Sequence, residues 1–146
     1  MKQLLNKNFH NQYQGSAMVE FALILPIFLL ILFGIINYSI LLFDQAIITN
    51  AAREGARWGA IHTTKTSTAV CSSSAAGATD PCVIANGYAS SGLVSFGSAT
   101  VSTSSTGDGT SGSEVSVTVT YQYTGLGYSL TSFDNQLIAR AVMYHE

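Results

Sequence analysis

A chain of 146 residues with eight acidic and six basic residues has room for one domain of ordinary size and carries a net charge of only −2. The basic residues are scattered, so there is no electrostatic footprint for a nucleic acid, and we expect no nucleic-acid partner. The sequence holds no GxSxG, no HExxH and no phosphate-binding glycine loop, and His10, His62 and His145 are expected to be ordinary surface residues. We therefore predict a protein that is not an enzyme and that needs no cofactor and no metal.

The chain begins with a polar segment, residues 1–15, that contains Lys2 and Lys7, has no acidic residue and ends at Gly15. A run of 23 residues without a charge, Phe21 to Phe43, follows closely. As a helix this run is roughly 34 Å long, enough for the roughly 30 Å hydrocarbon core of a bilayer. It is apolar on every face, unlike the buried helix of a soluble protein. The run therefore predicts a membrane-spanning helix over residues 21–43.

The flanks of the span predict its orientation. Cytoplasmic flanks retain Lys and Arg, so the basic leader favours a cytoplasmic N-terminus and a C-terminal part outside. Three basic residues after the span (Arg53, Arg57 and Lys65) favour the opposite orientation, but the short leader is the first segment to meet the translocon. A cleaved secretory signal is the competing interpretation. Its apolar stretch would be about 7–15 residues and would end at a small-x-small site, whereas this run ends at Asp44-Gln45.

The helix is expected to continue beyond the membrane, over residues 16–61. The segment from Asp44 to Ile61 holds no proline and several good helix formers. Its small residues recur at i, i+3, i+4 and i+7, and so form one stripe: Ala52, Gly55, Ala56 and Gly59. Such a stripe lets another backbone approach closely, and Glu54 and Arg57 can pair beside it. Because two glycines weaken an exposed helix, we expect packing to support this stretch.

Residues 62–146 are predicted to form a small domain outside the membrane. Residues 62–79 are rich in Thr, Ser and Ala and are predicted to be a loop. Cys71 and Cys82 are separated by ten residues, so they form neither a CxxC site nor a zinc ligand set. In an oxidising compartment such a pair most often forms one structural disulfide, and two free buried thiols are the alternative.

The rest of this domain is predicted to be a short helix and three strands. Asp80-Pro81 offers an N-cap followed by proline, so a helix is expected from Asp80 to Ser91. The segment Glu114–Tyr123 alternates strictly between apolar and polar residues, as a half-buried strand does. Two further strands are predicted at 97–104 and 136–144, and the Ser/Thr/Gly tract 102–112 between strands resembles a flexible hairpin loop. Three antiparallel strands need a partner for their apolar face, and the small-residue stripe is the expected one.

The aromatic residues outside the span allow two interpretations. We expect core and sheet packing for Trp58 and for the tyrosines at positions 121, 123, 128 and 144, and a binding face is the alternative. The predicted fold class is thus α+β, with a long N-terminal transmembrane and stalk helix and a small C-terminal domain.

The sequence around the start of the span carries the strongest indication of function. Glu20 lies at the mouth of the span, where a carboxylate is costly and usually marks a function; resting in the headgroup region is the alternative. A basic leader, Gly15, Glu20 at the fifth position after it and the aromatic Phe21 resemble a class III signal cut by prepilin peptidase. The longer string MVEFALILPIFLLILFGI, followed by ITNAAREGARWGA, resembles the TadE-like family of pseudopilins from Flp (Tad) pilus systems. The resemblance covers roughly residues 15–61 and extends weakly to the final strand.

The resemblance implies a pilin-like fold and a processing step. A membrane aspartic protease would cut between Gly15 and Ser16, where glycine lets the backbone approach the catalytic groups. The cut leaves an α-ammonium on Ser16, and Glu20 of a neighbouring subunit is expected to pair with it. Pro26 also matches the motif of the family and allows a local kink.

The resemblance further implies a place in the cell and a set of partners. It predicts a single-pass protein of the bacterial inner membrane with a periplasmic C-terminal domain, in or at the base of an extracellular pilus. The expected partners are membrane lipid, prepilin peptidase, other pilin or pseudopilin subunits and the inner-membrane assembly platform. The chain is too long for a major Flp pilin, so we predict a minor pseudopilin that supports pilus biogenesis, adhesion or secretion. The alternative is a membrane-anchored extracytoplasmic binding or adhesin-like protein that never polymerises.

Overall fold

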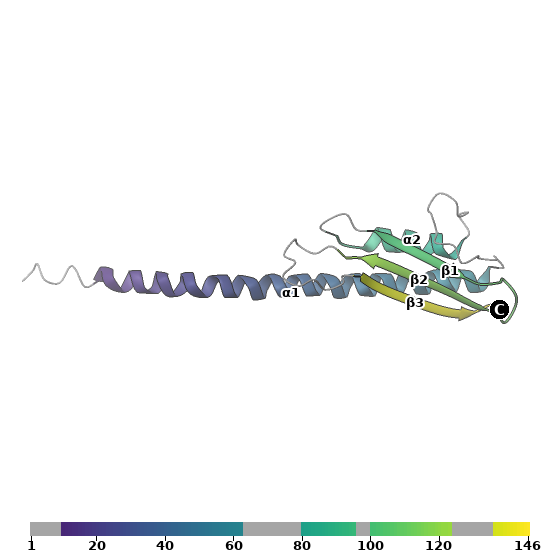
Figure 1. Cartoon of the computed structure of the whole chain (residues 1–146), viewed down its shortest axis with the longest axis horizontal. Coiled ribbons are helices and arrows are strands. Elements are labelled where there is room, and N and C mark those ends of the chain that lie inside the picture. Colours follow the sequence, from purple (N-terminus) through teal and green to yellow (C-terminus); the bar gives the residue numbers. More distant parts are fainter. Residues whose placement is uncertain (1–9, 63–79, 96–99, 124–135) are drawn as a thin grey trace, which may run out of the picture. The chain divides into compact units, whose positions relative to one another are not determined.

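The computed structural model describes residues 10–62, 80–95, 100–123 and 136–146. These residues fall into two compact units, one ending at Tyr38 and the other beginning at Ser39. The elements follow in the order α1 (His10–Ile61), α2 (Pro81–Gly92), β1 (Val101–Thr106), β2 (Glu114–Gln122) and β3 (Gln136–Tyr144) (Figure 1). A long helix, a short helix and a three-stranded sheet confirm the predicted α+β class.

Helix α1 contributes to both units. It runs through Pro26 and ends at Ile61, the predicted end, but it begins at His10 rather than at residue 16. The residues from His10 to Gln14 hold no proline and no glycine, so nothing in the sequence stops the helix from extending into the predicted leader. The leader and the helix therefore overlap over these residues.

The sheet belongs wholly to the second unit and has the strand order β1-β2-β3. Both pairings are antiparallel, and in the register Val119 of β2 lies between Thr103 of β1 and Ala139 of β3. The central strand matches its predicted bounds to within one residue, and β3 matches them fully. The apolar residues of β2 are buried at alternate positions, as the strict alternation predicts, and Ser116 on the other face is buried as well: Val115, Val117, Val119 and Tyr121 form the apolar face.

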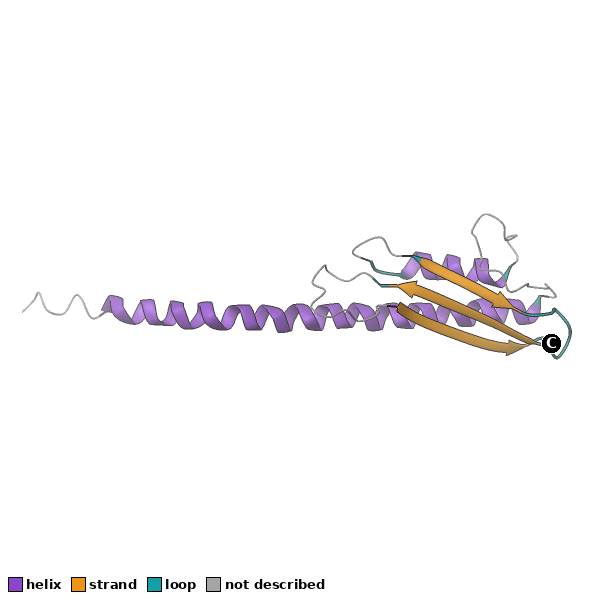
Figure 2. Ribbon diagram, viewed as in Figure 1, coloured by secondary structure: helices purple, strands orange, loops and turns teal. Residues whose placement is uncertain are grey.

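Both helices cover one face of this sheet, so the domain has two layers (Figure 2). Helix α2 packs on β1 and β2, and the part of α1 beyond Tyr38 packs on the same face. Asp80 caps α2, because its carboxylate accepts the N–H of Cys82 at 3.1 Å, and Pro81 takes the first helical position. The predicted short helix is thus present, displaced by one residue.

The first strand differs from its prediction. It begins four residues later and ends two residues later than expected, so Ser102 to Thr106 form a strand rather than a hairpin loop. The reason lies in the buried hydroxyls of this strand. Thr103 donates to the carbonyl of Cys82 at 3.3 Å, and Ser105 donates to the carboxylate of Asp80 at 3.3 Å. Small polar side chains therefore fill the inner face of β1 because the start of α2 offers them acceptors.

Candidate assembly site

The residues predicted for processing and assembly lie on exposed turns of α1, within the first unit. The side chains of Ser16, Glu20 and Phe21 are exposed, and Phe21 keeps 65% of its surface. A side chain at Gly15 would meet no atom within 4 Å. Glu20 forms no hydrogen bond or ion pair within residues 10–62, 80–95, 100–123 and 136–146. Gly15 is thus not covered by other described parts of the chain, and the carboxylate of Glu20 has no partner among the described residues.

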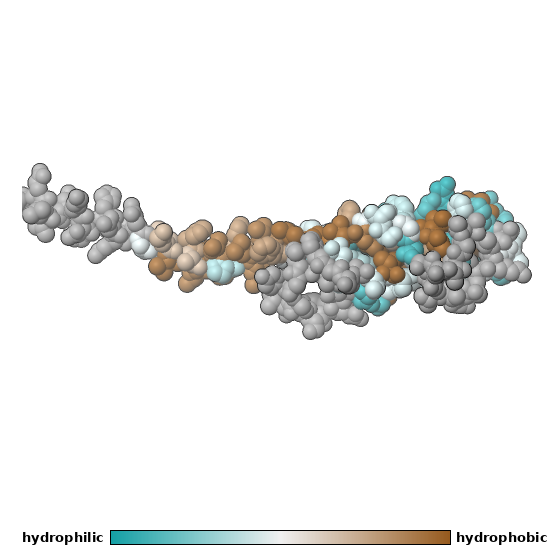
Figure 3. Space-filling model, turned by 90° about the horizontal axis from the view of Figure 1, so that it is seen from above, coloured by the Kyte–Doolittle hydropathy of each residue, from teal (hydrophilic) through white to brown (hydrophobic). Residues whose placement is uncertain are grey.

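The span that follows is apolar and uncovered. The helix from Gly15 to Ile61 is long and apolar enough to cross a membrane, and none of its most apolar 18-residue window is buried. Its large side chains remain exposed to solvent: Leu23 keeps 69% of its surface, Ile27 keeps 59% and Leu30 keeps 61%. Figure 3 shows apolar residues concentrated along the part of α1 that precedes the domain. Such a surface needs lipid or another protein to cover it, so the helix fits a membrane anchor.

The small-residue stripe lies inside the second unit. Ala52, Gly55, Ala56 and Gly59 are all buried. A Cβ built on Gly55 would lie 2.8 Å from the carbonyl oxygen of Pro81 and 2.9 Å from Cβ of Ala85. A Cβ on Gly59 would lie 2.7 Å from the Val115 side chain. The close backbone approach that the stripe allows is therefore made to α2 and β2 of the same chain.

Asp44, which was not predicted as a site residue, lies on α1 before this stripe and is fully buried. Its Oδ1 accepts the backbone N–H of Val94 at 3.0 Å, whereas its Oδ2 is buried without a hydrogen bond in the described part of the chain. The hydroxyl of Tyr121 donates to the carbonyl of Val94 at 3.4 Å. Burial raises the pKa of Tyr121, and the nearby charge of Asp44 raises it further. The one sequence signal for this site is a charged residue directly after the apolar run.

The ends of α1 and β3 meet at a second polar cluster, around His145. This residue is only 4% exposed, so its prediction as a surface histidine is wrong. Its Nε2 lies 3.0 Å from the carbonyl oxygen of His62, and its backbone N–H donates to Ser113 at 2.9 Å. The ring of His62 stacks on Trp58 with the centroids 3.9 Å apart. This cluster joins the last turn of α1 to the hairpin between β1 and β2, so its role is structural.

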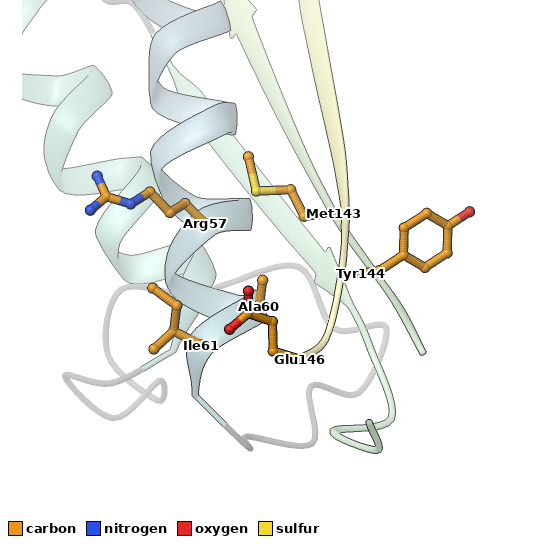
Figure 4. A pocket seen from close by; sticks show the side chains of 6 residues that line it. All are labelled: Arg57, Ala60, Ile61, Met143, Tyr144 and Glu146. Atoms are coloured by element: carbon orange, nitrogen blue, oxygen red, sulfur yellow. The ribbon is translucent and has the colours of Figure 1, made fainter. Parts of the chain in front are cut away.

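A pocket of about 310 Å³ opens next to this cluster. It is lined by Arg57, Ala60, Ile61, Met143, Tyr144 and Glu146 (Figure 4). The guanidinium of Arg57 and the ring of Tyr144 point away from each other in Figure 4, so they do not converge on a common point. No group of three or more His, Cys, Asp or Glu residues that could hold a metal ion occurs in the described ranges.

The remaining predicted residues divide between core and surface. Tyr121 and Tyr123 are buried in the core, as expected, whereas Tyr144 keeps 69% of its surface. Glu54 and Arg57 form the predicted ion pair at 3.7 Å. Cys82 is fully buried. Cys71 and Tyr128 lie outside the described residues, so the disulfide between Cys71 and Cys82 stays a prediction.

An exposed apolar helix with a carboxylate near its start, joined in sequence to a small α+β domain, is the arrangement expected of a membrane-anchored protein with a stalk helix. Comparison with known families is more specific: residues 15–57 match the family model described as TadE-like protein, which confirms the resemblance seen in the sequence. The match suggests a protein associated with a Tad pilus, and the TadE-like family is structural rather than catalytic. No curated protein and no solved structure matches the chain.

Proposed function

We propose that this chain is a minor pseudopilin of a Flp (Tad) pilus system. It is inserted in the inner membrane with a cytoplasmic N-terminus, is cut after Gly15 by prepilin peptidase, and assembles with other pilin-like subunits on the inner-membrane platform. The observation that supports this proposal best is the exposed carboxylate of Glu20 on an apolar helix, which has no partner among the described residues and lies inside the segment that matches the TadE-like family. The disulfide between Cys71 and Cys82 belongs to the proposal as a support of the periplasmic domain.

Charge explains why assembly follows processing. An unpaired carboxylate in hydrocarbon is costly, and a cationic partner relieves that cost. Cleavage after Gly15 creates such a partner, because the new α-ammonium on Ser16 has a reference pKa of about 7.7–8.0. Ser16 and Glu20 are four residues apart, so they share one face of α1 and are separated by about 6 Å along its axis. A neighbour displaced by one helical turn therefore brings its ammonium opposite this Glu20.

The processing step is tested on protein extracted from membranes of cells that express an active prepilin peptidase. Intact mass and N-terminal sequencing are expected to show a chain that begins at Ser16. The matched control is the same chain from cells without the peptidase, which keeps Met1. Recovery of Met1 from both cell types contradicts the proposal and favours an anchored binding protein that never polymerises.

The assembly step is tested with Glu20→Ala. We expect this variant to be cut after Gly15 and yet to fail in pilus assembly, because its neighbour's ammonium has no acceptor. Glu54→Ala is the matched control, since Glu54 is an acidic residue of the same helix whose side chain is 45% exposed and pairs with Arg57. Normal pilus assembly with Glu20→Ala would show that the carboxylate has no pairing role.

A further inference from the structure

A buried carboxyl group in the second unit has no role in the proposed function. Asp44 follows the apolar run directly and is fully buried. Its Oδ1 accepts the N–H of Val94 at 3.0 Å, whereas its Oδ2 is buried without a hydrogen bond in the described part of the chain. Removing an acceptor from water without giving it a donor costs free energy, and the cost is larger for an ionised group. Among the described residues, the ionised carboxylate thus has a donor for only one of its oxygens.

The hydroxyl of Tyr121 lies beside this carboxyl group. This phenol is fully buried, donates its proton to the carbonyl of Val94 at 3.4 Å and also forms a hydrogen bond with Ser95. Burial raises the pKa of Tyr121, and the charge of Asp44 raises it further. Burial and the same charge raise the pKa of Tyr123 as well. Both phenols are therefore neutral at any pH below about 10.

The other described elements bring no charge to Asp44. Helix α2 and strand β1 contain no Asp, Glu, Lys, Arg or His, and the phenol of Tyr88 in α2 keeps 44% of its surface. Arg140 of β3 is exposed and pairs with Glu114 at 3.4 Å. Asp44 itself forms no ion pair among the described residues. The residues one helical turn from it in α1 are apolar: Ile40, Leu41, Ile47 and Ile48.

A proton on Oδ2 completes the hydrogen bonding of this group. The protonated oxygen is a donor, and the phenol oxygen of Tyr121 can accept from it. The bonds then form a closed ring, in which Asp44 donates to Tyr121, Tyr121 to the carbonyl of Val94, and the N–H of Val94 to Oδ1 of Asp44. Bonds in such a ring polarise and strengthen one another. In the ionised form the phenol has one proton for two acceptors, the carbonyl and Oδ2, so one acceptor stays unfilled.

We propose that Asp44 is a pH-sensitive switch of this domain: on acidification its Oδ2 binds one proton and closes the ring of hydrogen bonds with Tyr121 and Val94. The ring joins α1, the segment directly after α2 and the central strand β2. Acidification thus fastens these three parts together at the point where the apolar run ends. The proposal concerns the stability of one domain, so it does not depend on processing at Gly15 or on assembly.

The direction of the pH effect follows from burial. Burial raises the pKa of the Asp44 carboxyl above its ordinary value of 3.8, although hydrogen bonds from Val94 and Tyr121 offset part of this effect. Asp44 lies outside the apolar run, in the part of α1 that belongs to the second unit. A pKa that folding raises gives a contribution to stability that is complete below about pH 4 and is lost as the pH rises through the pKa of the folded chain.

Asp44→Asn provides the test, because asparagine keeps an acceptor for Val94 and gives Tyr121 a donor that does not titrate. Unfolding of the full chain in detergent micelles is followed by circular dichroism from about pH 4 to about pH 8. We expect the Tm of the unsubstituted chain to fall by a few degrees over this range relative to that of Asp44→Asn. Asp108→Asn is the matched control. Hydrogen bonds from Ser113 and Thr110 hold the pKa of this exposed carboxyl at about 2, so its removal should leave the pH dependence nearly unchanged.

Carbon-13 NMR of the chain labelled at its aspartate carboxyl carbons measures the proton directly. The resonance that is absent from Asp44→Asn should titrate above pH 3.8. Tyr121→Phe removes the acceptor of the ring, so it should lower the Tm more at about pH 4 than at about pH 8. Tyr123→Phe is its matched control and should lower the Tm equally at both pH values, because Tyr123 is not a member of the ring.

Three results would each overturn the switch: equal pH profiles of the unsubstituted chain and Asp44→Asn, a titration of Asp44 at or below pH 3.8, or an equal loss of Tm at both pH values in Tyr121→Phe. An Asp44→Asn chain that does not fold would overturn it as well, since asparagine supplies the donor and the acceptor that the closed ring requires of position 44.

Discussion

The close contact at Gly55 predicts that one added methyl group destabilises the α+β domain. In Gly55→Ala the new Cβ would lie 2.8 Å from a backbone oxygen and 2.9 Å from Ala85, and neither neighbour is the flexible end of a long side chain. Overpacking of this kind costs about 1–3 kcal/mol, whereas alanine in place of glycine stabilises a helix by about 1 kcal/mol. We place the net cost in the upper part of the resulting range, at about 1–2 kcal/mol, because two contacts are violated together. This corresponds to a fall in Tm of about 5–10 °C.

The matched control is Gly87→Ala, in α2 of the same domain. A Cβ at this position would meet nothing within 4 Å, so only the gain in helix propensity remains. The two substitutions are therefore chemically identical and should shift Tm in opposite directions. Thermal unfolding of the full chain in detergent, followed by circular dichroism, measures both shifts. A Gly55→Ala variant that is as stable as the unsubstituted chain would refute the packing argument.

Three further predictions concern the polar groups of the same domain, each measured by unfolding of the full chain. Asp44→Ala should lower the free energy of unfolding by about 1–3 kcal/mol, because the N–H of Val94 loses its acceptor. Asp44→Asn keeps an acceptor oxygen and removes a buried charge, so it should be at least as stable as the unsubstituted chain. Asp80→Ala should cost about 1 kcal/mol through loss of the helix cap, and an unchanged Tm would contradict that role. Burial raises the pKa values of Tyr121 and Tyr123, so the stability of the domain should be full below about pH 10 and fall as the pH rises further. Tyr121→Phe should weaken this pH dependence, and an unchanged pH profile in that variant would contradict the role of Tyr121.

Periodicity was sufficient to predict most of the fold. The strict alternation of β2 follows from one buried and one less buried face, and the spacing of the small residues in α1 correctly located the surface that meets the sheet. The prediction for β1 was less accurate, because its inward residues are Thr103 and Ser105 rather than apolar side chains. Their burial depends on acceptors at the start of α2, which lie more than 20 positions away in the sequence. Composition alone cannot reveal such a tertiary hydrogen bond.

The candidate site could be predicted only where its chemistry is local. Gly15, Ser16 and Glu20 form a short motif at fixed spacing, and residues 15–57 carry the family match. Asp44 was missed because its partner is the backbone N–H of Val94, which is 50 residues away. Nearly every residue has a backbone N–H, so the sequence cannot indicate which one a side chain meets. The burial of His145 was missed for the same reason, since its ring meets a carbonyl 83 residues away.

The two carboxylates that border the apolar run of α1 differ in what their own chain provides. Asp44 is enclosed by its domain and accepts the N–H of Val94, so folding accounts for its charge at least in part. Glu20 is exposed, and the described part of the chain offers it no donor. Since a carboxylate among apolar groups is costly, the proposed function assigns Glu20 a partner on a neighbouring subunit. Under that proposal, folding of one chain stabilises the charge at the Asp44 end of the apolar run, and assembly stabilises the charge at the Glu20 end.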